Sequence, residues 1–265
     1  MMSVFVRLVE LQDSHEKEIE FNNPSRRYSS RTELFQKIPG CLFAYWLTPQ
    51  MIDCFDSLKS VSAIANTKQG FKTGNNDRFL RLWFEVSSAK LSFDGYRSDK
   101  KWFPCNKGGV ARKWFGNQDY IVNWENDGEE IKNNRDDKGK LLSRPQNLAF
   151  NFKKGMTWTS ITSGALTMRF SGEEMMFESK GSGCFPNEDR NLYELLGYLN
   201  SCVALSFIKV LAPTLDYSEG AVSRIPYKEI QSEEIEKLVC ENIEIAKEEW
   251  DDFEGSWGFE KHPLI

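Results

Sequence analysis

Residues 68–81 combine basic side chains and amides around two glycines, a set suited to contact with nucleic acid. Gly70 and Gly74 bracket a loop whose backbone can approach another molecule closely. The cations and hydroxyls can bind phosphate oxygens, and the asparagine amides can read the edge of an adenine base. The same string also fits an ordinary glycine–asparagine turn between two strands. The candidate contacts are Lys72, Thr73, Asn75, Asn76 and Arg78.

Residues 100–117 interleave basic and aromatic side chains around a flexible Gly108–Gly109 pair. This pattern suits contact with a nucleic-acid backbone together with stacking on bases or sugars. Alternatively, the two Trp-Phe pairs are core anchors and only the basic residues are exposed. We expect a mixture, in which the tryptophans are mostly packed and the cations face DNA. The candidate cations are Lys107, Arg112 and Lys113.

Residues 143–164 form a third polar segment, which ends in a run of Ser and Thr hydroxyls over residues 157–163. Hydroxyl groups beside basic residues make good phosphate contacts. A half-buried strand rich in threonine would look much the same, so this pattern is less specific. The candidate contacts are Arg144, Asn147, Lys154, Thr162, Ser163 and, on the strand that follows, Arg169.

Catalytic and metal-binding patterns are scarce. The two histidines, His15 and His262, are expected to be solvated surface residues. The six cysteines lack CxxC spacing, so the sequence predicts no zinc site and favours free thiols in the cytoplasm. The string 181–183 lacks the frame of a phosphate-binding loop, and the sequence contains no strand followed by GxGxxG and no Pro-Pro-aromatic loop for a flipped adenine. The sequence therefore predicts no cofactor site in this chain.

Charge is divided unevenly along the chain. The formal net charge is −5, yet residues 228–265 alone hold twelve acids and four lysines, a balance of −8. Residues 68–113 hold eleven basic and four acidic residues, a balance of +7. A local positive excess is the electrostatic footprint of a phosphate-binding surface, although charged runs are more often solvated faces. No stretch approaches ~18 apolar residues, so no membrane partner is predicted.

Periodicity and turn chemistry predict an α+β fold: a β-rich central region with long loops, flanked by helices and ending in a helical segment. Thr48 as N-cap and Pro49 in the first turn predict a helix to residue 58, and an amphipathic helix is expected over residues 232–250. A single buried helix is expected over residues 191–210. Its apolar positions at helical spacing are Leu192, Leu195, Leu196, Leu199, Val203, Phe207 and Val210.

The central region is expected to be twisted or barrel-like. Its predicted strands are residues 79–86, 120–124, 148–152, 166–170 and 175–178, and two more are expected at 4–9 and 41–46. Three domains are predicted: residues 1–59, an N-terminal αβ segment continuing from an upstream catalytic domain; residues 60–228, a target-recognition domain; and residues 229–265, an acidic C-terminal helix and tail.

Taken in order, these segments resemble the region after the catalytic domain in PglX-type adenine-specific methyltransferases of BREX phage-exclusion systems. They resemble more loosely the TaqI-like specificity domain of type IIG restriction-methylation enzymes. The resemblance spans nearly the whole chain, and residues 101–117 are its most specific part. It is carried by residues 70–81, 101–117, 120–128, 144–147, 155–164, 199–201, 213–217 and 256–264.

The resemblance implies DNA target recognition, not methyl transfer, because such enzymes carry their cofactor- and adenine-binding motifs upstream of this region. It implies double-stranded DNA as the partner, together with a methyltransferase catalytic domain or other defence-system proteins. That catalytic domain would bind S-adenosylmethionine and flip the adenine. Two alternatives stay open: a protein-interaction or scaffold module of the defence complex that docks through its acidic last helix, and a free-standing metal-dependent nuclease that uses acidic pairs such as Glu173–Glu174.

Overall fold

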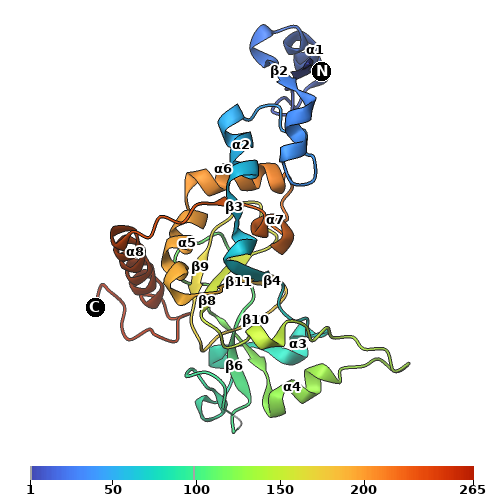
Figure 1. Ribbon diagram of the computed structural model, residues 1–265. Helices are drawn as coiled ribbons and strands as arrows, with labels where there is room; N and C mark the ends of the chain where they lie inside the picture. The colour runs from blue at the N-terminus through green and yellow to red at the C-terminus, as the bar shows by residue number, and fades with distance from the viewer. Residues whose placement is uncertain (1, 98) are drawn as a thin grey trace.

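Two four-stranded sheets form the centre of the computed structural model, which describes residues 2–97 and 99–265 (Figure 1). The first sheet contains, in spatial order, β4 (Ala65–Lys68), β11 (Gly181–Pro186), β8 (Gly155–Thr159) and β9 (Arg169–Ser171), all antiparallel to their neighbours. The second contains β10 (Met176–Phe177), β6 (Trp102–Asn106), β7 (Tyr120–Asn123) and β5 (Leu80–Leu82), with only the β10–β6 pair parallel.

The chain passes from the first sheet to the second along residues 69–74. Gly70 leaves no room for a side chain, because a Cβ there would lie 2.1 Å from the backbone oxygen of Phe177. Phe71 then pairs in parallel with Glu178, in the segment that returns the chain from β10 to β11. The two crossings therefore contact each other, and this contact holds the sheets together.

A helical layer covers one face of the first sheet. It contains α5 (Leu192–Leu199), α6 (Cys202–Leu211) and α7 (Glu219–Ser223), which share a core with the side chains of Met156 and Trp158 on β8. The long helix α8 (Glu233–Asp251) packs on α5 (Figure 1), as predicted for the last amphipathic helix. Gly197 permits this close approach, because a Cβ at that position would lie 2.8 Å from Val239.

The N-terminal residues form a separate small core at one end of the molecule (Figure 1). β1 (Met2–Val6) and β2 (Arg27–Arg31) pair antiparallel, and α1 (Ser14–Phe21) lies between them in sequence. α2 (Pro49–Ser57) begins as predicted, with the Thr48 hydroxyl accepting a hydrogen bond from the Met51 N–H at 3.3 Å. β3 (Lys59–Ser60) pairs with β12 (Pro226–Tyr227) and so ties this part to the helical layer.

The second sheet lies at the opposite end, beside α3 (Asn76–Phe79) and α4 (Glu125–Lys132) (Figure 1). Its core contains Phe71, Phe103 and Trp124, all fully or nearly fully buried. A hairpin over residues 134–142 projects from this end of the molecule (Figure 1).

Residues 191–210 form two helices, α5 and α6, so the prediction of one continuous helix is wrong. The helices are bent by 79° at a break that contains Asn200. The Asn200 side chain pairs with the backbone of Met168, accepting from its N–H at 2.9 Å and donating to its C=O at 3.0 Å. Ser201 then caps α6. Val203, predicted to be buried, is exposed in the first turn of α6.

The predicted strands were found only in part. Residues 120–124 and 175–178 contain β7 and β10, whereas residues 166–170 become a strand only at Arg169. Residues 41–46 form no strand; Tyr45 instead stacks on Phe5 with ring centroids 4.7 Å apart.

Of the three remaining predicted strands, the one over residues 4–9 overlaps β1, and the other two are interrupted by turns. Residues 148–152 contain a 3₁₀ turn, flanked by Asn147 and Phe152 at φ 54° and 59°, which breaks an extended strand. Residues 79–86 divide between the end of α3, the short β5 and a second 3₁₀ turn.

The α+β prediction is confirmed: helices and small sheets are mixed, and the sheets do not close into a barrel. The predicted domain boundaries stay a prediction; the one between residues 59 and 60 falls within β3. Within residues 2–97 and 99–265, no single helix has both the length and the apolar content needed to cross a membrane.

We expect Asn200→Ala to lower the free energy of unfolding by ~1–3 kcal/mol, because it leaves the buried N–H of Met168 without its partner, whereas the Met168 carbonyl still accepts from the Trp114 N–H. Urea denaturation of the whole chain measures this. The exposed Asn242 bonds one carbonyl of its own helix, so Asn242→Ala should change stability by no more than ~0.5 kcal/mol. Equal effects of the two substitutions would contradict this role of Asn200.

Candidate nucleic-acid interface

Two of the predicted segments lie side by side. The loop after β4 and the loop over residues 142–147 are joined at Lys72 and Arg144, whose backbone groups exchange hydrogen bonds of 3.0 and 2.9 Å. The Asn147 amide donates to the carbonyl of Gln69 at 2.9 Å. The backbone therefore holds residues 69–74 and 142–147, here called the paired loops, in one fixed arrangement.

Gly74 allows the two loops to approach this closely. Its φ is +76°, and a Cβ would lie 2.6 Å from the carbonyl carbon of Leu142. Asn147 has φ 54°, in the left-handed region that asparagine tolerates better than most residues. Gly74 and Asn147 are thus needed for the backbone conformation of these loops, which agrees with the alternative prediction of an ordinary glycine–asparagine turn.

Several predicted contact residues have local structural roles. Thr73 is buried, and its hydroxyl donates to the Asn76 side-chain oxygen at 2.6 Å. Asn75 is the N-cap of α3 and accepts from the Arg78 N–H at 3.0 Å. Both asparagines are exposed, and these bonds occupy their oxygens and leave their amide N–H groups to other partners.

The cations of these loops differ in what they bind. Lys72 and Arg144 are exposed, and no carboxylate among the described residues lies within ion-pair distance of either. Arg78, in contrast, donates to Glu130 at 2.6 Å and holds the pKa of that carboxyl below its usual value. A phosphate could reach Lys72 or Arg144 without competition, whereas Arg78 would first have to leave Glu130.

A cavity of about 480 Å³ adjoins the paired loops and contains residues that the sequence analysis missed. Phe150 lines it, with the ammonium groups of Lys68 and Lys153 lying 5.3 and 5.2 Å from its ring centroid. Two carboxylates, Glu173 and Asp189, also line it. Lys68 and Lys153 lay inside the predicted segments, and their proximity to an aromatic residue was the signal that could have identified them.

Lys107 lies at another edge of the same region. Its ammonium is 4.0 Å from the ring centroid of Tyr120, and both residues line a groove of about 360 Å³ with Asn76 and Asp77. The Lys107 loop is therefore adjacent to the loop before α3.

Arg112 and Lys113, predicted to face DNA, are engaged with the helical layer. Arg112 forms an ion pair with Glu249 of α8, and its guanidinium lies 5.1 Å from the Trp250 ring centroid. The Lys113 ammonium donates to the Asn200 carbonyl at 2.8 Å. The second segment is thus divided between the region of Lys107 and the base of α8.

The remaining hydroxyl and lysine candidates lie on the first sheet and the helical layer. Lys154 lines the same cavity as Lys153, and its ammonium lies 5.8 and 5.1 Å from the ring centroids of Phe170 and Tyr193. The Thr162 N–H donates to the carbonyl of Leu215 at 3.1 Å, and Ser163 is exposed next to it. No hydrogen bond, ion pair or ring contact found in the described residues joins them to the paired loops.

Arg169 is almost fully buried, with 1% of its surface exposed. Burial lowers the pKa of Arg169 to about 10, so the guanidinium is charged at neutral pH. Its Nε has no hydrogen-bond partner among the described residues, and its NH1 reaches only the Arg112 carbonyl, at 3.5 Å. A side chain in this position cannot contact DNA without rearrangement of the sheet.

No group of three or more His, Cys, Asp and Glu side chains suited to a metal ion occurs within the described residues. The glycines of the 181–183 string lie inside β11, where a Cβ on Gly181 would lie 2.4 Å from the carbonyl oxygen of Asn106. They serve strand packing, and their strand conformation does not fit a loop that wraps a cofactor phosphate.

The chain is similar over its whole length to part of two known proteins, and no family model matches it. It is 36% identical over 276 residues to the adenine-specific methyltransferase PglX of Lacticaseibacillus casei (strain Zhang), covering 100% of this chain and 23% of that protein. It is 36% identical over 266 residues to the adenine-specific methyltransferase BrxX of Escherichia coli O9:H4 (strain HS), covering 99% of this chain and 21% of that protein. The chain thus spans less than a quarter of the length of either relative.

Arg169→Met tests whether the buried guanidinium of Arg169 contributes to the stability of the fold. A methionine of similar reach removes a buried charge that has no carboxylate partner, so the free energy of unfolding should stay the same or rise by ~1–4 kcal/mol. Urea denaturation measures the change, and Arg169→Ala, which leaves a cavity, serves as the comparison. A marked loss of stability in the methionine variant would show that the guanidinium has a partner that it needs.

Proposed function

We propose that this chain, which is similar over its whole length to one region of PglX-type adenine-specific methyltransferases, recognises the DNA target of such an enzyme. The observation that carries the proposal is the pairing of Lys72 with Arg144. It gathers cations that lack carboxylate partners on two fixed loops, beside a cavity lined by an aromatic ring. Positive groups of this kind supply the electrostatic part of DNA binding.

In the proposed complex, cations bind the phosphates and the amides of the loop before α3 read base edges. The phosphate contacts are Lys68, Lys72, Lys107, Arg144 and Lys153, and the base contacts are Asn75, Asn76 and Arg78. Thr73, Asn147 and Arg169 shape the protein instead. Lys154 lines the cavity beside Lys153 and is a further phosphate contact in the proposal. Arg112, Lys113, Thr162 and Ser163 lack a link to the paired loops, and we leave them out of the proposed interface.

Methyl transfer itself belongs, in this proposal, to regions of the relatives outside the part matched here. The curated relatives are named adenine-specific methyltransferases, and more than three quarters of each lies outside the match. The modified base would be an adenine, extruded from the duplex into a site on those regions. The cysteines of the chain are free, which fits a protein of the reducing cytoplasm.

Removal of a phosphate contact should weaken binding to every sequence. We expect Arg144→Ala, or Lys72→Ala, to lower the slope of log affinity against log salt by about one unit. Mobility-shift titrations of one duplex at several salt concentrations measure this. Lys113→Ala, which removes a cation bonded to Asn200, should leave the slope unchanged. The proposal fails if the chain binds no duplex at low salt, or if Lys113→Ala alone changes the slope.

Removal of an amide should instead change which sequence is bound. Asn75→Ser keeps a hydroxyl that can cap α3 but removes the amide N–H groups, so discrimination at one base position should fall by ~1–3 kcal/mol. Selection of bound duplexes from a random pool, with wild type and variant in parallel, measures this. An unchanged consensus would remove Asn75 from the base contacts.

We also expect the chain on its own to bind no S-adenosylmethionine. The reason is that its sequence lacks both the glycine-rich cofactor loop and the adenine clamp. Titration calorimetry with the methyl donor tests this, and saturable binding at one site per chain would contradict it.

A further inference from the structure

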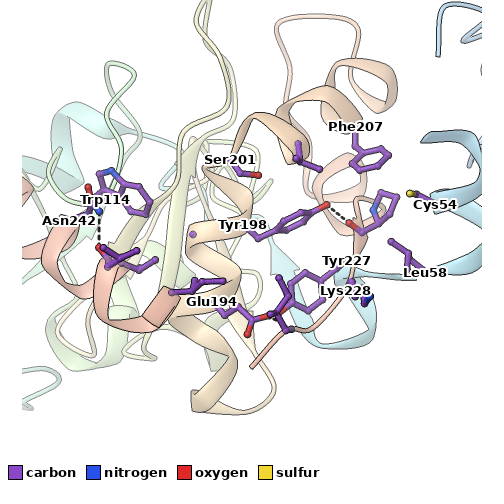
Figure 2. A pocket seen from close by; sticks show the side chains of 17 residues that line it. Cys54, Leu58, Trp114, Glu194, Tyr198, Ser201, Phe207, Tyr227, Lys228 and Asn242 are labelled. Carbon is purple, nitrogen blue, oxygen red and sulfur yellow. Dashed lines mark hydrogen bonds between the residues drawn. The ribbon is translucent and has the colours of Figure 1, made fainter. Parts of the chain in front are cut away.

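A groove of about 520 Å³ lies between α8 and the end of α2, with α5 and α6 at its base (Figure 2). Figure 2 shows Trp114 and Asn242 on one side, Cys54 and Leu58 on the other, and Tyr198 between them. It is distinct from the paired loops and shares none of the proposed DNA contacts.

Large apolar side chains in the groove remain exposed to solvent. Leu238, Val203 and Ile230 line it and are 50%, 53% and 64% exposed. On the same helix, Ile235 and Val239 pack into the core, so Leu238 extends the apolar stripe of α8 beyond the buried face. Contiguous exposed apolar side chains of this kind mark interaction sites.

Hydrogen bonds fix the walls of the groove. The buried Glu194 carboxylate accepts from the Tyr227 hydroxyl and the Ile230 N–H, both at 2.7 Å, and from the Gln231 N–H at 2.6 Å. The Tyr198 hydroxyl donates to the carbonyl of Pro226 (Figure 2). A preformed groove costs a partner little ordering of this chain.

The wall formed by α8 is strongly acidic. The helix holds eight Asp and Glu residues and two lysines. Only three of its acids have an ion pair among the described residues, with Lys237, Lys247 and Arg112. The other five have no ion pair among the described residues: Glu233, Glu234, Glu236, Glu244 and Glu248. Glu234 lies one turn before Leu238 on the same side of α8, whereas Glu233 and Glu236 line a separate pocket with Arg190.

We propose that this groove binds an amphipathic helix from a partner protein, with an apolar stripe flanked by Lys and Arg. A helix that lays residues at i, i+3, i+4 and i+7 into an apolar groove is a common recognition mode. The basic flanks would meet the net negative charge of α8, with Glu234 nearest to Leu238, and charge complementarity of this kind favours the right partner and repels wrong ones.

The same charges argue against other occupants. A second copy of this chain would bring its own acidic α8 toward the first across a self-complementary contact, which places like charges together. Duplex DNA would bring phosphates to the same acidic helix. The proposal concerns a protein partner and holds whether or not the paired loops bind DNA.

The test uses the whole chain and a synthetic helical peptide of ~18 residues, or five turns. The peptide has leucine in the i, i+3, i+4, i+7 pattern and lysine at every other position. A matched peptide replaces every lysine with glutamate. Calorimetry should find saturable binding of about one lysine peptide per chain and at least roughly tenfold weaker binding of the glutamate peptide, because the acidic helix repels it. Equal binding of both peptides would overturn the proposed basic partner.

Two variants carrying the same added charge locate the binding site. Leu238→Lys places a cation in the groove on an exposed helical position, so α8 should still form, and binding should weaken about tenfold or more. Val9→Lys makes the same change at an exposed position of the N-terminal part and should leave binding unchanged. If both variants lose peptide binding equally, or if neither loses it, the peptide is attracted by the overall charge of the chain, and the proposed binding site is wrong. Light scattering provides a second check. If the wild-type chain is a dimer and Leu238→Lys makes it a monomer, the groove binds a second copy of this chain, and the proposed partner is wrong.

Discussion

The close approach of residues 69–72 to the backbone at residues 177–178 is the constraint on which the rest of the structure depends. Gly70 makes it possible, since any side chain would collide with the Phe177 carbonyl. The contact joins the two sheets, and it also sets the direction in which the chain leaves toward α3. Because Lys72 pairs with Arg144 directly after this point, the same constraint positions the loops that carry the proposed DNA contacts.

The molecule separates its charges in space as well as in sequence. Cations without carboxylate partners gather near the junction of the sheets, whereas unpaired carboxylates line α8 on the helical layer. The overall charge of −5 therefore says little about what either surface binds. A basic surface that binds phosphate and an acidic helix that binds a basic partner can coexist in one chain. Salt screens the electrostatic interactions of each surface beyond a Debye length of ~10 Å.

Sequence reasoning worked best where the determinants are local. The Thr48 cap and the apolar stripe of α8 predicted two helices well, because capping and periodicity act within a few residues. It was wrong at Asn200, where a side chain pairs with the backbone of Met168, 32 positions earlier, and ends a helix whose apolar spacing continues.

The site was harder to predict than the helices, because exposure of a cation depends on which distant residues it meets. Arg112 belongs to the same basic and aromatic segment as Lys107, yet it forms an ion pair with Glu249 from the far end of the chain. Arg169 sits on a short strand where two-residue alternation alone does not tell which face is buried. Lys153 was overlooked because its aromatic neighbour, Phe150, was assigned to a strand that does not form.

Amide hydrogen exchange of the chain with and without saturating duplex DNA tests the central claim most directly, since it reports which surface is covered. The account predicts slowed exchange in residues 68–78 and 142–154, with α8 unchanged. Protection confined to residues 112–117 and 157–164 would contradict it, because DNA would then lie against the segments that the paired loops do not touch.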